Sequence, residues 1–352
     1  MRITLRGGGR GHGPRDALAG GARSTSSRPA TSSRSWRRRA GFLGDAAEVR
    51  RSTACAILEE NRVRLGKTLV SNVVGGALGL PGNVGACFRA HRQLRARGGH
   101  QRLRSWTYLY GKTHGLPILS IDNMQVIHRC QLPDDVVAGH QASFQLTRAF
   151  IKAKLPGCDG YYITTFFHPP VRKPDTALFP PILRPEILAA ERSAGEHLLV
   201  YQPGPSEALT SALARAGVPC RIYGMRPGLT ADVTEGAMTY RPFSETAFIA
   251  DLASCRGVVA GGGFTLMGEA VFLGKPMLAL PLAGQFEQVL NARYLEREGF
   301  GVCGEDVAQP GLIDRFLARI PACAAALARY THDHNRGLLA AVDRFLASSR
   351  RR

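Results

Sequence analysis

The sequence predicts an α/β protein built from two doubly wound domains. Its 352 residues exceed what one ordinary hydrophobic core supports. The composition, with 44% hydrophobic and 21% charged residues, is typical of a soluble globular chain. In the C-terminal half, apolar runs of strand length alternate with amphipathic segments, which indicates a parallel sheet with helices on both faces.

The elements expected in the C-terminal half follow this alternation. The expected strands are His197–Gln202, Cys220–Gly224, Gly257–Ala260, Pro276–Leu280 and Phe300–Cys303. The expected helices are Ser206–Ala216, Ser244–Ser254, Leu266–Leu273, Phe286–Glu298 and Gly311–Arg319, followed by a long helical pattern over Ala322–Leu346.

The N-terminal half also reads as α/β, with fewer clear elements. The expected strands are Arg2–Leu5, Ile118–Ile121 and Tyr161–Phe166, and the expected helices are Val84–Arg97, Ser105–Thr113 and Phe144–Lys154. The proline-rich stretch Pro169–Pro185 is the natural linker, so we expect domains at 1–175 and 186–346.

Two segments, Pro14–Ala40 and Arg95–Arg104, lack both apolar periodicities and are rich in Arg, Ser, Gly and Ala. One interpretation is a disordered basic loop, and the other is that both are read out of frame. Residues 1–104 carry 21 Lys and Arg against five acids, so the net charge of +19 is mainly local. Because few aromatic residues are interleaved with that charge, we expect no nucleic-acid partner.

The eight cysteines form no CxxC pair and no zinc-type cluster. They are therefore expected to be buried thiols of a cytoplasmic protein. No apolar run reaches the roughly 18 residues of a membrane span, so any membrane contact is expected to be peripheral. No DxD-type acidic motif occurs in the readable region, and neither a metal nor another cofactor is expected.

The strongest local feature is a glycine turn between a strand and a helix. Gly261, Gly262 and Gly263 follow Gly257–Ala260, and Phe264 and Thr265 begin the next helix. Free amides and the helix dipole at such a turn attract a diphosphate, although a plain tight turn has the same pattern. Glu269 lies further along the same helix, where its carboxylate can accept hydrogen bonds from both hydroxyls of a ribose.

A second polar group follows the next expected strand. It consists of Gln285, Glu287, Gln288 and Asn291. At the start of a helix these side chains would point into the same cleft and bind sugar hydroxyls, although a solvated first turn is the alternative.

These residues resemble a known family. The run GGGFTLMGEAVFLGKPMLALPLAGQFEQVLNARYLEREGFG is similar to the donor half of inverting glycosyltransferases of the GT-B fold. The resemblance extends to the group that forms lipid II by adding N-acetylglucosamine and to the UDP-glucuronosyltransferase-like group, with a bacterial and archaeal branch as the nearest match. It implies two Rossmann-like domains facing across a cleft, and it spans Ser105 to about Leu346.

The resemblance also suggests residues for chemistry and base binding. His12, in a glycine-rich loop, would take the proton of the acceptor hydroxyl, and Asp122 would orient His12 or the acceptor. An incidental histidine in a flexible linker and a simple turn after a strand are the respective alternatives. Phe243 would lie near the nucleotide base.

The resulting hypothesis is a glycosyltransferase that moves a sugar, with inversion, from a UDP-linked donor to a glycan or lipid-linked acceptor. Its expected place is the cytoplasm or the inner face of the membrane, in the synthesis of a cell envelope glycan. A sugar-nucleotide 2-epimerase of the same fold and an inactive or basic interaction protein are the alternatives.

Overall fold

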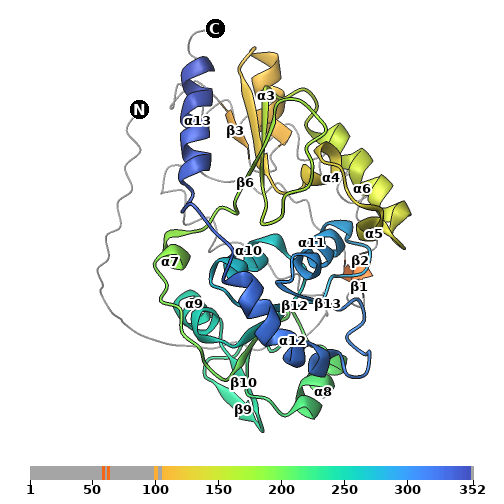
Figure 1. Ribbon diagram of the computed structural model, residues 1–352, viewed down its shortest axis with the longest axis vertical. Coiled ribbons are helices and arrows are strands. Elements are labelled where there is room, and N and C mark those ends of the chain that lie inside the picture. Colours follow the sequence, from red (N-terminus) through yellow and green to blue (C-terminus); the bar gives the residue numbers. More distant parts are fainter. Residues whose placement is uncertain (1–57, 60–61, 64–98, 102–104, 350–352) are drawn as a thin grey trace, which may run out of the picture. The chain divides into compact units, whose positions relative to one another are not determined.

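The computed structural model describes residues 58–59, 62–63, 99–101 and 105–349 (Figure 1). Two short strands, β1 (Leu58–Glu59) and β2 (Arg62–Val63), pair antiparallel. The expected strand Arg2–Leu5, the helix Val84–Arg97 and the loop that carries His12 lie outside these residues, as does Pro14–Ala40.

A parallel sheet in the order β3-β4-β5-β6 organises the first half of the described chain. Its strands are β3 (Gly99–Gln101), β4 (Ile118–Asp122), β5 (Gly160–Thr164) and β6 (Thr176–Phe179). Its helices are α3 (Ser105–Thr113), α4 (Val126–Arg129), α5 (Asp134–Val137) and α6 (Gln141–Lys154).

Both edge strands correct the sequence analysis. β3 lies inside Arg95–Arg104, where no regular element is expected, and β6 lies inside the expected linker. β3 pairs Gly99 with Ile118 of β4, and β6 pairs Thr176 with Tyr161 of β5. Each of these strands is stabilised by backbone hydrogen bonds to the neighbouring strand. Such bonds do not depend on the side chains, so they leave no pattern of apolar residues in the sequence.

A sheet in the order β13-β12-β11-β7-β8-β10-β9 organises the second half; only β9 is antiparallel. Its strands are β7 (Leu198–Tyr201), β8 (Cys220–Tyr223), β9 (Val233–Glu235), β10 (Met238–Arg241), β11 (Gly257–Ala260), β12 (Met277–Ala279) and β13 (Gly301–Cys303). Its helices are α7 (Pro185–Leu188), α8 (Glu207–Ala216), α9 (Glu245–Ser254), α10 (Phe264–Phe272), α11 (Phe286–Arg297) and α12 (Leu312–Leu327).

The elements expected between His197 and Cys303 are confirmed with small shifts at their ends, whereas the helix expected over Gly311–Arg319 continues through Pro321 to Leu327. The β9–β10 hairpin is the exception, since no strand was expected there. Val233–Glu235 is exposed throughout, so β9 lacks the buried residues that mark a strand in the sequence.

The order of these strands reverses once. β8 and β10 follow β7 on one side, whereas β11, β12 and β13 continue on the other side. In open parallel sheets, ligands bind beyond the carboxyl ends of the strands at such a reversal. A ligand is therefore expected to bind near the loops that follow β7 and β11.

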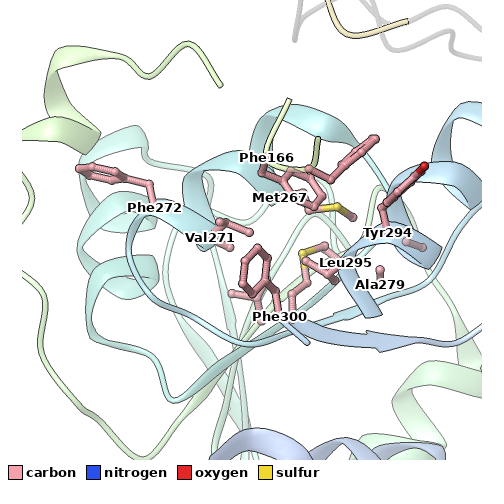
Figure 2. Close-up of a cluster of buried hydrophobic side chains, with 14 of the residues drawn as sticks. Phe166, Met267, Val271, Phe272, Ala279, Tyr294, Leu295 and Phe300 are labelled. Atoms are coloured by element: carbon pink, nitrogen blue, oxygen red, sulfur yellow. The ribbon is translucent and has the colours of Figure 1, made fainter. Parts of the chain in front are cut away.

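Aromatic side chains from the end of β5 enter the large apolar core. Phe167 stacks on Tyr294 of α11 with ring centroids 3.9 Å apart, and Phe166 lies parallel to Phe264 of α10 at 6.0 Å. Figure 2 shows Phe166 and Tyr294 in this cluster together with Met267 and Phe300. Burial of these rings connects the first sheet to α10 and α11.

The expected helix Ala322–Leu346 is broken. α12 ends at Leu327, and α13 (Arg336–Ser349) begins after a turn in which His334 and Asn335 have positive φ. α13 returns to the first sheet, where its Ala341 carbonyl accepts a hydrogen bond from the Tyr162 hydroxyl at 3.2 Å. No helix in the described ranges is long and apolar enough to cross a membrane.

Candidate functional site

The turn after β11 leaves the start of α10 open. Gly263 precedes the helix without a capping side chain, and a Cβ added to it would meet no atom within 4 Å. Within the described part of the chain, the amides of Gly263, Phe264 and Thr265 donate no hydrogen bond. Unsatisfied amides together with the helix dipole give this end hydrogen-bond donors and a positive potential, both of which favour an anion.

Gly262 has a different task from Gly263. A Cβ at Gly262 would lie 2.4 Å from the carbonyl oxygen of Gln288, so only glycine lets the turn approach α11 this closely. Its amide donates to the Gln288 side chain at 3.2 Å, and its carbonyl accepts from Asn291 at 3.2 Å. The amide of Gly262 is thus already used within the protein.

Gln288 and Asn291 face the protein in this structure. The Gln288 Oε1 atom also accepts a hydrogen bond from the amide of Leu282 at 3.0 Å, and its Nε2 atom donates to Gln285 at 2.6 Å. Asn291 is fully buried. Both residues therefore hold the turn after β11, and Gln288 ties it to the loop after β12. The structure thus brings the glycine turn and the polar group at the start of α11 together. In this structure, however, Gln288 and Asn291 bind the loops of the protein and do not point into an open cleft.

Asp122 and Glu287 lie in one partly buried electrostatic cluster with Lys154. Burial and then the charge of Asp122 raise the pKa of Glu287, whereas Lys154 lowers it. Burial also raises the pKa of Asp122, although its carboxylate accepts hydrogen bonds from the Gln125 amide at 2.8 Å and the Ser120 hydroxyl at 2.9 Å. The carboxylates of Asp122, at the end of β4, and Glu287, at the start of α11, are therefore electrostatically coupled.

Glu269 is almost completely buried, with a side chain that is 5% exposed. Its two oxygens accept hydrogen bonds from Arg184, at 2.9 Å from Nε and 3.1 Å from Nη2. Burial raises the pKa of Glu269, and the hydrogen bonds from Arg184 oppose that shift. Arg184 is not among the residues expected from the sequence, because nothing in a proline-rich segment indicates that its side chain reaches α10.

Phe243 presents an open aromatic surface. It is 62% exposed and is held edge-on against Tyr223, with centroids 6.5 Å apart. It lies two residues before Glu245, which also contacts Arg184. An exposed ring fixed in this way can stack on a planar ligand.

The loop after β7 is a second feature that the sequence analysis missed. Gly204 has a φ of 102°, which glycine adopts without strain, and the Ser206 side chain caps α8 by accepting from the Leu209 amide. The loop lies at the strand reversal opposite the turn after β11. The run Gly204-Pro205-Ser206 before a helix is the signal that would have indicated it.

The open depression lined by His197, Cys220 and Thr239, about 330 Å³ in volume, is a different place. Its lining residues precede or begin strands β7, β8 and β10, so it lies at the amino ends of the sheet, away from the loops described above. Among the described residues, no group of three or more His, Cys, Asp or Glu side chains could hold a metal ion.

The two Rossmann-like sheets, together with a match to a family of glycosyl transferases, define a glycosyltransferase of the GT-B fold. The chain belongs to glycosyl transferase family 1, whose profile matches residues 5–321. No curated protein matches the sequence.

Solved glycosyltransferase structures resemble the chain. The glycotransferase of kitacinnamycin has 15% identity and a TM-score of 0.51 over 84% of this chain and 82% of that one. Phytolacca americana UGT2, complexed with UDP-2fluoro-glucose and pterostilbene, has 14% identity and a TM-score of 0.47, covering 66% and 69%. The spinosyn rhamnosyltransferase SpnG, complexed with thymidine diphosphate, has 18% identity and a TM-score of 0.47, covering 76% and 77%. At 15% identity the likeness to the first of these structures shows the fold alone.

Proposed function

We propose that the protein transfers a sugar from a UDP-linked donor to an acceptor hydroxyl, with inversion at the anomeric carbon. The observation that carries this proposal is the open start of α10 at the strand reversal, where Gly263, Phe264 and Thr265 offer unpaired amides. These amides would bind the diphosphate and stabilise its charge as it departs.

The proposal assigns the remaining donor contacts to side chains around that point. Phe243 would stack on the base, and Glu269 would bind the ribose. Glu287 would contact the sugar, while Gln285, Gln288 and Asn291 would hold the loops that carry Gly261 and Gly262. No metal is needed in this arrangement, because the helix start supplies the positive potential.

The reaction would be a single in-line displacement. The acceptor oxygen bonds to the anomeric carbon from the face opposite the diphosphate, and the breaking bond leaves its electron pair on the diphosphate oxygen. The acceptor proton would pass to His12, which lies outside the described residues. Asp122, coupled to Glu287 in the electrostatic cluster, would orient the acceptor or the base.

The domain division proposed from this assignment is an acceptor-side domain over 1–175 and a donor domain over 186–346, with β6 and α13 added to the acceptor side because both lie against the first sheet. A lipid-linked acceptor and peripheral contact with the inner face of a membrane are part of the same proposal. They are supported by Leu146 and Phe150 on α6, whose side chains are 51% and 50% exposed, and by exposed Lys152 on the same helix.

Ligand-induced thermal stabilisation tests the donor site. UDP and UDP-sugars are expected to raise the melting temperature of the wild-type protein. Gly263→Val should remove that shift, because the new side chain would occupy the space where the diphosphate lies, whereas Ala325→Val on the exposed surface of α12 should retain it. Equal stabilisation of both variants would refute the assignment of the helix start.

A product assay tests the reaction itself. A UDP-sugar should give UDP and a glycosylated product only when an acceptor is present. An epimerised nucleotide sugar without acceptor would instead support the epimerase.

A further inference from the structure

The segment that precedes Arg184, from Pro181 to Leu183, is held at several points. The Leu183 amide donates to Asn335 Oδ1 at 3.0 Å, and the Leu183 carbonyl accepts from Asn335 Nδ2 at 2.8 Å. A Cβ on Gly268 of α10 would lie 2.8 Å from Pro181, so this segment also packs directly on α10. The backbone beside Arg184 is thus fixed against the helix that carries Glu269.

The guanidinium of Arg184 serves two carboxylates. Two of its nitrogens bind the two oxygens of Glu269 in a fork, and the third, Nη1, contacts Glu245. The side chain of Glu245 is 54% exposed, whereas that of Glu269 is 5% exposed. Arg184 therefore covers the buried carboxylate while it also holds a second, solvent-accessible one.

This arrangement conflicts with direct ribose binding. A ribose with 2′- and 3′-hydroxyls binds a carboxylate best by donating to both oxygens, which is the pattern that Arg184 already satisfies. The two ribose hydroxyls can hydrogen-bond to Glu269 only if the guanidinium of Arg184 moves away from it. Glu245 offers the withdrawn guanidinium a partner, so the exchange does not leave it without a counter-charge.

We propose that Arg184 is a specificity-determining residue that competes with the nucleotide ribose for Glu269. In the free protein it occupies the carboxylate, and on donor binding it yields to the 2′,3′-diol while it stays paired with Glu245. The competition reduces the advantage of a ribose over a 2′-deoxyribose. This inference rests on the proposed donor site. It adds to that site the residue that sets how strongly a ribonucleotide is preferred over a 2′-deoxyribonucleotide.

The test compares UDP with 2′-deoxy-UDP, which differ only in one hydroxyl, by isothermal titration calorimetry. In the wild-type protein the two dissociation constants should agree within about threefold, because the gain from the second hydroxyl is offset by the lost contacts of Arg184. In Arg184→Gln the carboxylate is free, and the preference for UDP should rise to about tenfold or more.

Three further variants keep the outcome interpretable. Arg184→Lys retains the charge but loses the fork, so it should show an intermediate preference, and it serves if Arg184→Gln does not fold. Adding Glu269→Gln to Arg184→Gln should reduce the preference again. Arg226→Gln removes a guanidinium that also binds a carboxylate in a fork, through Nη1 and Nη2 at 2.7 and 2.6 Å from Glu235, and should leave the wild-type ratio unchanged.

The outcomes separate the two proposals. If both nucleotides bind and their ratio is the same in Arg184→Gln and Arg184→Lys as in the wild type, the competition by Arg184 is wrong, and the donor site stands. If neither nucleotide binds any of these proteins, the donor site is wrong, and the inference about Arg184 falls with it.

Discussion

The side chain of Gln288 accepts a hydrogen bond from the amide of Gly262 at 3.2 Å and thereby fastens α11 to the turn after β11. The same oxygen accepts from Leu282, in the loop after β12. One amide oxygen thus sets the spacing of two loops at the candidate donor site, so the position of the open helix start depends on a residue that need not touch the donor.

Replacement of Gln288 by leucine should destabilise the protein by about 1–3 kcal/mol, because two backbone amides lose their acceptor. Urea unfolding measures this change. Gln309→Leu, at an exposed position, is the matched control and should alter stability by less than about 0.5 kcal/mol. Equal effects of the two substitutions would show that Gln288 does not brace the loops.

The two neighbouring glycines should respond differently to alanine. Gly262→Ala should cost about 1–3 kcal/mol or more, since the new Cβ would lie 2.4 Å from the Gln288 carbonyl oxygen. Gly263→Ala should leave stability within about 0.5 kcal/mol, because its Cβ points into open space and its φ is −69°. Thermal or urea unfolding of both variants decides the matter, and a reversed order would contradict the described turn.

The cluster of Glu287, Asp122 and Lys154 predicts a pH-dependent stability. Since burial raises the pKa of Glu287 above its ordinary value of 4.5, the folded protein holds this proton more tightly than the unfolded chain. The resulting stability is present at pH below that ordinary value and is lost as pH rises through the raised pKa. Glu287→Gln cannot lose this proton, so its stability relative to the wild type should increase with pH.

Urea unfolding over a pH series measures this difference. Glu235→Gln is the control of opposite sign, since its hydrogen bonds with Arg226 lower the pKa of Glu235. Stability from Glu235 is lost as pH falls. A pH-independent difference between Glu287→Gln and the wild type would contradict the cluster.

The stacked pair of Phe167 and Tyr294 should be a major support of the core. Phe167→Ala should destabilise the protein by about 3–5 kcal/mol, because the ring is fully buried. Phe150→Ala, at a half-exposed ring, should cost much less. A double-mutant cycle with Tyr294→Leu should give a coupling energy of about 0.5–1.5 kcal/mol, and additive effects would show that the rings do not interact.

Local patterns in the sequence predict the alternation of strands and helices from His197 to Cys303, apart from the β9–β10 hairpin, and the place of the glycine turn. Both follow from local physics, since buried strands need continuous apolar runs, and a strand-to-helix turn needs residues without bulk. The expected helix starts at Ser206 and Ser244 lie at the observed caps of α8 and α9 for the same reason.

Which polar side chains of the candidate site face the protein depends on tertiary packing and cannot be predicted from local sequence. Gln288 and Asn291 are polar residues of the kind that bind sugars. Because Gly262 lies so close to α11, however, both side chains hydrogen-bond to Gly262 itself. Arg184 and Glu269 are 85 positions apart in the chain, and nothing local to either residue indicates their pairing. The partner of a buried polar group is set by whichever segment packs over it, and that depends on the fold of the whole chain.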